Sequence, residues 1–109
     1  QLGISTSAEV YQKTNGQKAQ VAGLVITRQR PASANSVTFV TLEDETGNIN
    51  LVVWKHLAEK QRRELLGAHL LGAVGEVQRD GDVLHLIAHR LLDHSSLLAN
   101  LTNRSRNFR

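Results

Sequence analysis

Five strand-like segments, with one helical segment inserted between the third and the fourth, constrain the fold of this chain more than any other feature. Side chains of a strand point to opposite faces in turn, so alternating apolar residues are typical of strands with one buried face. The predicted helix covers residues 55–67, where apolar side chains recur at helical spacing and Gly67 ends the pattern. The predicted strands lie at residues 19–27, 36–44, 48–54, 70–78 and 83–92.

The turn residues between these segments predict how the strands pair. Residues 44–48 (DETGN) separate the second and third strands, and residues 79–82 (RDGD) separate the fourth and fifth. Because glycine adopts the positive φ angles that tight turns need, both connections predict antiparallel hairpins. Gly23, in the middle of the first strand, predicts a bend or a bulge. Before the strands, the spacing of Thr6 and Glu9 is that of a capping box, which predicts a short helix at residues 6–14.

The order of these elements indicates an all-β architecture with accessory helices. A short helix, three strands, one helix and two strands is the order of the OB-fold, a five-stranded, partly open Greek-key barrel. Its face over strands two and three binds oligonucleotides, together with the loops between strands one and two and between strands four and five. We therefore predict an N-terminal lead-in at residues 1–16, an OB-fold domain at 17–93 and a basic tail at 94–109.

The composition excludes several classes of protein. The 109 residues contain no cysteine, which excludes disulfide frameworks, cysteine-ligated zinc and cysteine nucleophiles. Nothing in this composition points to an oxidising compartment, so we expect the cytoplasm. No run of about 18 apolar residues occurs, so we expect no membrane-spanning helix. The chain starts without Met and without the basic and apolar regions of a signal peptide, which predicts a fragment or a processed chain, monomeric in solution.

Patterns for catalysis and metal binding are absent from the sequence. His85 and His89 lie four residues apart on one predicted strand, a distance of about 13 Å, which is too long for one metal ion. The acidic run at residues 43–45 fits a hairpin turn better than a Mg²⁺ site. No phosphate-binding loop, nucleophile elbow or dinucleotide fingerprint occurs. We therefore expect no catalytic residue, no metal site and no cofactor in this chain.

Four strings of residues are similar to one bacterial protein family. These strings are VAGLVITRQRP, FVTLEDETGNINLVVW, QRRELLGAHLLGAVGEVQRDGDVLHLIAHRLLD and the terminal TNRSRNFR. Over residues 16–109 the chain resembles the C-terminal OB domain of bacterial error-prone C-family DNA polymerases, which are α-subunit-like enzymes of the mutasome. The resemblance implies a non-catalytic module of a polymerase that acts in DNA-damage tolerance and the SOS response, with its metal-binding carboxylates in upstream sequence.

The same resemblance implies single-stranded DNA as the ligand, and positioning or tethering of the polymerase in translesion synthesis and DNA repair as the role. A shorter string, FVTLEDETG, also resembles the OB domains of replicative α subunits and of class II aminoacyl-tRNA synthetases. Two alternatives stay open. One is a protein-interaction module that docks mutasome partners or the rest of the polymerase chain, and the other is an RNA-binding module such as an anticodon reader.

Candidate binding residues follow from what a single strand requires. An OB domain that holds a single strand needs cations along the phosphate path and aromatic faces on which bases stack. Arg28 and Arg30 lie where the first predicted strand ends, and Arg79 lies in the hairpin between strands four and five. Phe39 and Thr41 share one face of the second strand. These residues therefore form the candidate surface for nucleic acid.

The resemblance adds roles for two residues. In the tRNA-synthetase domains, the Phe that matches Phe39 stacks on an anticodon base, and the position that matches Asn50 contacts a base. We predict that Trp54, at the end of the third strand, packs over the mouth of the barrel. Lys55 and Arg62 belong to the predicted helix, whose mixed charges are typical of a solvated face. One Trp, one Tyr and two Phe are few for a protein that stacks bases, which predicts weak binding.

The positive charge of the chain is concentrated at one end. The net charge is +3, yet residues 1–93 hold ten Lys and Arg against ten Asp and Glu. The excess lies in Arg104, Arg106 and Arg109 of the tail. Electrostatic affinity for nucleic acid rises with the number of phosphates contacted. A neutral barrel with a cationic tail therefore predicts weak, salt-sensitive binding of single-stranded DNA, with tail contacts that add nonspecific attraction.

Overall fold

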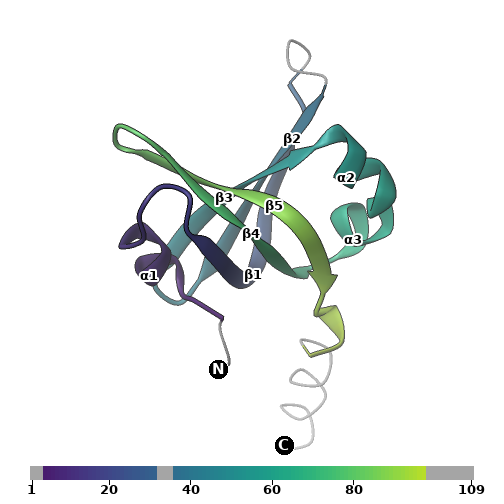
Figure 1. Cartoon of the computed structure of the whole chain (residues 1–109). Coiled ribbons are helices and arrows are strands. Elements are labelled where there is room, and N and C mark those ends of the chain that lie inside the picture. Colours follow the sequence, from purple (N-terminus) through teal and green to yellow (C-terminus); the bar gives the residue numbers. More distant parts are fainter. Residues whose placement is uncertain (1–3, 32–35, 98–109) are drawn as a thin grey trace, which may run out of the picture.

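Five strands form a closed barrel in the computed structural model, which describes residues 4–31 and 36–97 (Figure 1). The order around the barrel is β1, β2, β3, β5, β4, with β3 and β5 parallel and the other pairs antiparallel. This arrangement confirms the predicted all-β OB-fold class with accessory helices. The strands are β1 (Lys18–Gln29), β2 (Val37–Asp44), β3 (Gly47–Trp54), β4 (Leu70–Asp80) and β5 (Val83–Asp93). The helices are α1 (Ser7–Tyr11), α2 (Lys55–Lys60) and α3 (Arg62–Gly67).

The first strand, β1, bends so that it pairs with two neighbours and closes the barrel. Its first half pairs with β4 and its second half with β2, and Leu24 belongs to both ladders. A Cβ atom on Gly23 would lie 2.7 Å from the backbone oxygen of Glu43, so the chains approach here more closely than a side chain allows. A shift in register between Val25 and Thr27 adds to the bend. The irregularity predicted at Gly23 is therefore present, and β1 continues two residues beyond its predicted end.

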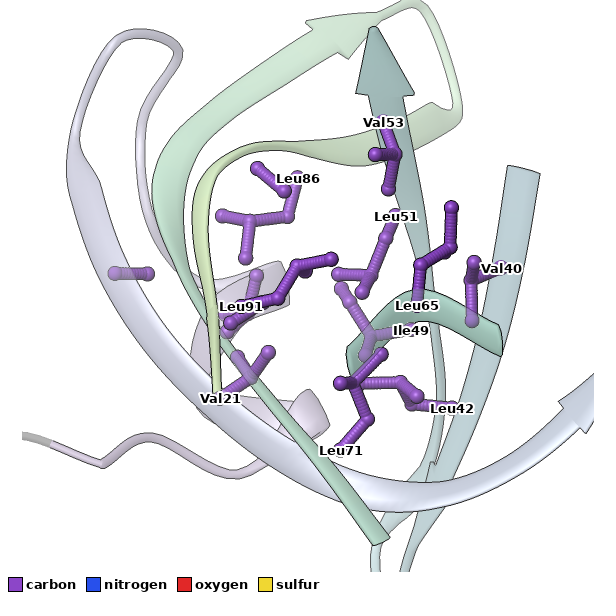
Figure 2. Close-up of a cluster of buried hydrophobic side chains, with 14 of the residues drawn as sticks. Val21, Val40, Leu42, Ile49, Leu51, Val53, Leu65, Leu71, Leu86 and Leu91 are labelled. Carbon is purple, nitrogen blue, oxygen red and sulfur yellow. The ribbon is translucent and has the colours of Figure 1, made fainter. Parts of the chain in front are cut away.

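The core lies inside the barrel, where the inward side chains of all five strands meet (Figure 2). On β3, Leu51 and Val53 are fully buried, and Ile49 beside them is almost so. Burial of one such side chain stabilises the fold by about 1.5–3 kcal/mol. The helices close the barrel from two sides, with Val10 of α1 and Leu65 of α3 in the same apolar cluster (Figure 1). Apolar residues alternate along the strands because one face of each strand is turned to this cluster.

The helical segment between β3 and β4 is interrupted at Gln61, so the single helix predicted over residues 55–67 is wrong. Gln61 has φ −117° and ψ 42°, which ends α2 before α3 begins. Its amide nitrogen donates to the Leu91 carbonyl at 2.8 Å, and its amide oxygen accepts from the Leu91 N–H at 2.7 Å. This contact joins the helical segment to β5. None of the helices in the described residues is long and apolar enough to cross a membrane.

We expect the Gln61→Ala variant to lose about 2 kcal/mol of unfolding free energy, because both backbone groups of Leu91 lose a partner. Urea denaturation followed by circular dichroism measures the loss. Gln12→Ala is the matched control, because the Gln12 side chain is exposed at the end of α1. An equal stability of the two variants would show that the Gln61 amide does not hold the helical segment on β5.

The short N-terminal helix has the capping box that the sequence predicts. Thr6 Oγ1 accepts from the Glu9 N–H at 3.1 Å, and the Thr6 N–H donates to Glu9 Oε1 at 2.8 Å. The helix itself is shorter than predicted, since it ends at Tyr11. Asp44, at the end of β2, accepts from the backbone N–H of Ser7 at 2.6 Å and of Thr46 at 2.8 Å. One carboxylate therefore joins the start of α1 to the β2–β3 turn.

The hydrogen bonds that Asp44 accepts change the pKa of its carboxyl group. Partial burial raises the pKa, but hydrogen bonds from Ser7 and Thr46 outweigh burial and hold it below its ordinary value of 3.8. The stabilisation that these hydrogen bonds give is therefore complete above the ordinary pKa of 3.8. It is lost as the pH falls through the lower pKa that Asp44 has in the folded state. We expect Asp44→Asn to destabilise the fold by about 1–3 kcal/mol at neutral pH, and by less in acid. Denaturation of both proteins across this pH range tests the prediction, and a difference that does not change with pH would contradict it.

Candidate nucleic-acid interface

The outer face of the barrel carries two rows of side chains that cross all five strands. Residues opposite one another on neighbouring strands point to the same face of a sheet. The first row comprises Thr27, Thr41, Asn50, His85 and Gln78. The second row comprises Gln29, Phe39, Val52, Ile87 and Glu76. We call these two rows the outer face; they bring together three of the residues predicted from the sequence, Phe39, Thr41 and Asn50.

Phe39 forms an aromatic pair with His85 of β5 on this face. The ring centroids lie 6.2 Å apart, and the ring planes are inclined by 47°. Both side chains are half-buried, whereas Val40, the next residue on β2, is fully buried in the core. The phenyl ring therefore belongs to the surface of the barrel, where a base can reach it. Sequence reasoning considered His85 only as a metal ligand, although its alternation with the inward Leu84 and Leu86 already indicated an outward side chain.

Thr41 and Asn50 form a polar pair beside the two rings. Thr41 Oγ1 donates to Asn50 Oδ1 at 3.0 Å, across the β2–β3 ladder. Because the amide oxygen of Asn50 accepts this bond, its amide nitrogen supplies the donors of the group. Such donors can bind the acceptor atoms on the edge of a base. The outer face thus combines a ring for stacking with an amide for hydrogen bonding.

Arg28 lies on the other side of the sheet from Phe39. It is opposite Val40 of the core, and its Nε donates to the Leu65 carbonyl at 2.7 Å. A second nitrogen of the guanidinium donates to the Ala68 carbonyl, so Arg28 binds the C-terminal end of α3. The pairing of β1 with β2 therefore separates this arginine from the aromatic ring with which the sequence grouped it.

Arg28 instead lines a cleft between the end of the β1–β2 pair and the two helices α2 and α3. The cleft has a volume of about 280 Å³. Its charged lining residues are the cations Arg28, Arg30, Lys55 and Arg62 and the carboxylate Glu59. We call this site the basic cleft. Lys55 and Arg62 were interpreted from the sequence as a solvated helix face, and only the packing of the helices against β1 and β2 shows that their charges gather here.

Arg79 occupies a third place, apart from both surfaces. Its guanidinium donates to the carbonyl oxygens of Tyr11 at 2.6 Å and Lys13 at 3.1 Å, and its backbone N–H donates to Asn15 Oδ1 at 2.8 Å. Arg79 therefore joins the β4–β5 hairpin to the segment after α1. The predicted tail contacts, Arg104, Arg106 and Arg109, lie outside the described residues.

Trp54, which the sequence predicts to pack over the barrel mouth, is 45% exposed and lies outside the buried apolar cluster. It lies opposite Val37 at the end of the β2–β3 ladder and directly precedes α2. Within residues 4–31 and 36–97, no three His, Asp or Glu side chains gather as the ligands of a metal ion would. Besides Asp44, Asp93 has a displaced pKa, which hydrogen bonds from Ser95 lower. Both carboxylates belong to turns and caps of the fold.

The comparisons with known proteins agree with this geometry. The sequence model of a family described as "OB-fold nucleic acid binding domain" matches residues 19–93. An error-prone DNA polymerase of Methylococcus capsulatus is 54% identical over 97% of this chain and 10% of its own length. An error-prone DNA polymerase of Azoarcus sp. is 60% identical over 82% of this chain and 8% of its own length. The chain therefore spans about a tenth of these curated relatives, and it is similar to their C-terminal part.

Solved structures share the fold at low sequence identity. Asparaginyl-tRNA synthetase from Pyrococcus horikoshii, in complex with asparaginyl-adenylate, is 23% identical with a TM-score of 0.68, over 83% of this chain and 22% of that one. The OBody AM1L10, bound to hen egg-white lysozyme, is 15% identical with a TM-score of 0.65, over 83% of this chain and 91% of that one. Because the matching family model spans all five strands of the barrel, the chain belongs to the family of OB-fold nucleic acid binding domains.

Proposed function

We propose that this chain is a single-stranded DNA-binding module of an error-prone DNA polymerase. The observation that carries the proposal is the half-buried Phe39–His85 ring pair beside the Thr41–Asn50 pair on the outer face. Stacking of a base on an aromatic side chain is worth about 1–3 kcal/mol and is tolerant of sequence. The similarity to error-prone DNA polymerases favours DNA over RNA as the ligand.

The charges of the domain support weak binding. Arg28 and Arg79 add positive charge to the domain away from the outer face, and both guanidinium groups also bind backbone carbonyls. Arg30 adds a third charge, and the tail arginines add nonspecific attraction. Because the barrel itself is close to neutral, few phosphates are contacted and the affinity falls steeply with salt.

In the parent polymerase, the module positions or tethers the enzyme on single-stranded template during translesion synthesis after DNA damage. It acts in the bacterial cytoplasm as a monomeric domain at residues 17–93, between the lead-in and the basic tail. Catalysis lies in another part of the parent chain, and mutasome proteins are further partners. The similarity of the chain to only about a tenth of each polymerase supports the proposal that catalysis lies in another part of the parent chain.

Fluorescence anisotropy of a labelled oligo-dT at low salt tests the proposal on the 109-residue chain. We expect saturable binding with a Kd of up to ~100 µM, and weaker binding of a duplex of the same length. The slope of log K against log salt should be about −0.7 for each phosphate contacted. Unsaturated titrations throughout this range would overturn the proposal, and so would stronger competition by tRNA than by single-stranded DNA.

A protein-interaction module is the second candidate, because Leu24 and Ile26 of β1 are exposed beside the register shift of that strand. The OBody neighbour, which is bound to lysozyme, is a protein of this fold that binds protein. In a pull-down, the chain should capture the rest of the polymerase, and the double variant Leu24→Ser with Ile26→Ser should not. This result would support the candidate. Capture that persists in this double variant would count against it.

A further inference from the structure

Trp54 adds a second aromatic side chain to the outer face, beyond the half-buried Phe39. Phe39 is opposite Val52, and Trp54 is the next residue of β3 on the same face. Diagonal neighbours of this kind are roughly 7–8 Å apart in an antiparallel pair. The indole is 45% exposed, unlike the core residues that precede it on β3. Trp54 is therefore the next aromatic residue on this face along β3 from the position opposite Phe39.

The basic cleft lies close to Trp54, the last residue of β3. A shallow hollow beside α2 is lined by Trp54, Lys55, His56 and Glu59. Lys55 and Glu59 also line the basic cleft, so the two depressions adjoin along α2. The indole and the cations of the cleft therefore lie on one continuous surface.

The cleft suits a phosphate because its charge is positive and one of its cations is held in place. Four cations line it against one carboxylate. Two of the five guanidinium donors of Arg28 bind the carbonyls of α3, which fixes the side chain and leaves donors for a further acceptor. Lys55 and Arg62 supply charges from the helices on the other wall. Arginine and lysine in such an arrangement are typical of phosphate sites.

We propose that Trp54 and the basic cleft form a nucleotide subsite of the single-stranded DNA, with a base stacked on the indole and the adjoining phosphate held by Lys55, Arg28 and Arg62. This inference rests on the proposed function, because it extends the path of the same strand beyond Phe39. A nucleotide uses both the flat indole and the cations, whereas an acidic peptide uses the cations and leaves the indole without a planar partner.

Intrinsic fluorescence tests the subsite directly, because Trp54 is the single tryptophan of the chain. The unmodified chain is titrated with unlabelled oligo-dT while its tryptophan is excited selectively over Tyr11. We expect quenching that saturates at the same concentration as anisotropy of the labelled oligonucleotide. Saturating anisotropy with unchanged tryptophan fluorescence would overturn the subsite and leave the proposed function standing. The absence of both signals would overturn the proposed function.

Charge variants test the phosphate half of the subsite. We expect Arg62→Ala to weaken oligo-dT binding by about 3- to 10-fold and to reduce the salt slope by about 0.7. Arg63→Ala is the matched control, since Arg63 is exposed on the same helix and does not line the cleft. Equal losses in the two variants would show that general charge, and not the cleft, holds the phosphate. Displacement of the oligonucleotide from the chain by equimolar poly-glutamate would also overturn the proposal, in favour of an acidic peptide.

Trp54→Leu tests the stacking half without removing a charge. We expect a 5- to 150-fold loss of affinity, the range expected for one stacked base, with most of the binding restored in Trp54→Phe. Circular dichroism and urea denaturation verify that both variants fold. Affinity that is unchanged in Trp54→Leu would overturn the stacking role.

Discussion

Phe39→Ala should weaken binding of single-stranded oligo-dT by about 5- to 150-fold, which corresponds to about 1–3 kcal/mol for one stacked base. The ring lies on the outer face and outside the buried apolar cluster, so its removal takes away a stacking surface and leaves the barrel core intact. Anisotropy titrations at one fixed low salt concentration measure the loss. The affinity should decrease, but the slope of log K against log salt should stay unchanged, because the ring contacts no phosphate.

Two further variants serve as controls for the loss of the Phe39 ring. Tyr11→Ala removes an aromatic ring from α1 that is 42% exposed and belongs to neither row of the outer face, and it should leave the affinity unchanged. Phe39→Tyr keeps the aromatic face and should bind close to the parent level. If Phe39→Ala binds as tightly as Tyr11→Ala, then bases do not stack on the outer face, and the proposal of single-strand binding by this face is wrong.

Leu51→Ala should destabilise the fold by about 3–5 kcal/mol, the largest effect on stability that we expect from a single substitution. Leu51 is 0% exposed on β3, at the middle of the apolar cluster in Figure 2. The substitution removes buried methyl groups and leaves a cavity that a closed barrel cannot fill by collapse. A domain of this size is stabilised by about 5–15 kcal/mol in total, so the variant should melt far below the parent.

Leu66→Ala is the matched control for the core. Leu66 is 53% exposed on α3, and the same chemical change there should alter stability by no more than about 0.5 kcal/mol. Urea denaturation of the two variants and the parent measures both effects. A loss below about 1 kcal/mol for Leu51→Ala would show that the barrel core relaxes around the cavity.

The strands and hairpins could be predicted from the sequence because their signals are local. The period of two in residues 36–44 and 48–54 separates inward Val40 and Leu51 from outward Phe39 and Asn50, and DETGN supplies the turn. The break at Gln61 could not be predicted, since its cause is a pair of hydrogen bonds to Leu91, thirty residues away. No helical periodicity carries information about that contact.

The candidate site was predicted in part for the same reason. Phe39 and Thr41 share a face by alternation, whereas Asn50 was predicted from the resemblance and lies opposite Thr41 once the hairpin forms. The position of Arg28 depends on how β1 pairs with β2, including the register shift between Val25 and Thr27. Alternation within β1 alone does not say which face of β2 its arginine shares.

The sequence by itself determined the barrel class, the hairpin turns and the shared face of Phe39 and Thr41, because strand period and turn chemistry act over a few residues. Only the tertiary structure decided that Arg28 binds the end of α3, that Arg79 binds the segment after α1, and that Lys55 and Arg62 share a cleft. Each of these outcomes joins residues that are far apart in the chain. They depend on register and packing, which the order of residues along one strand does not contain.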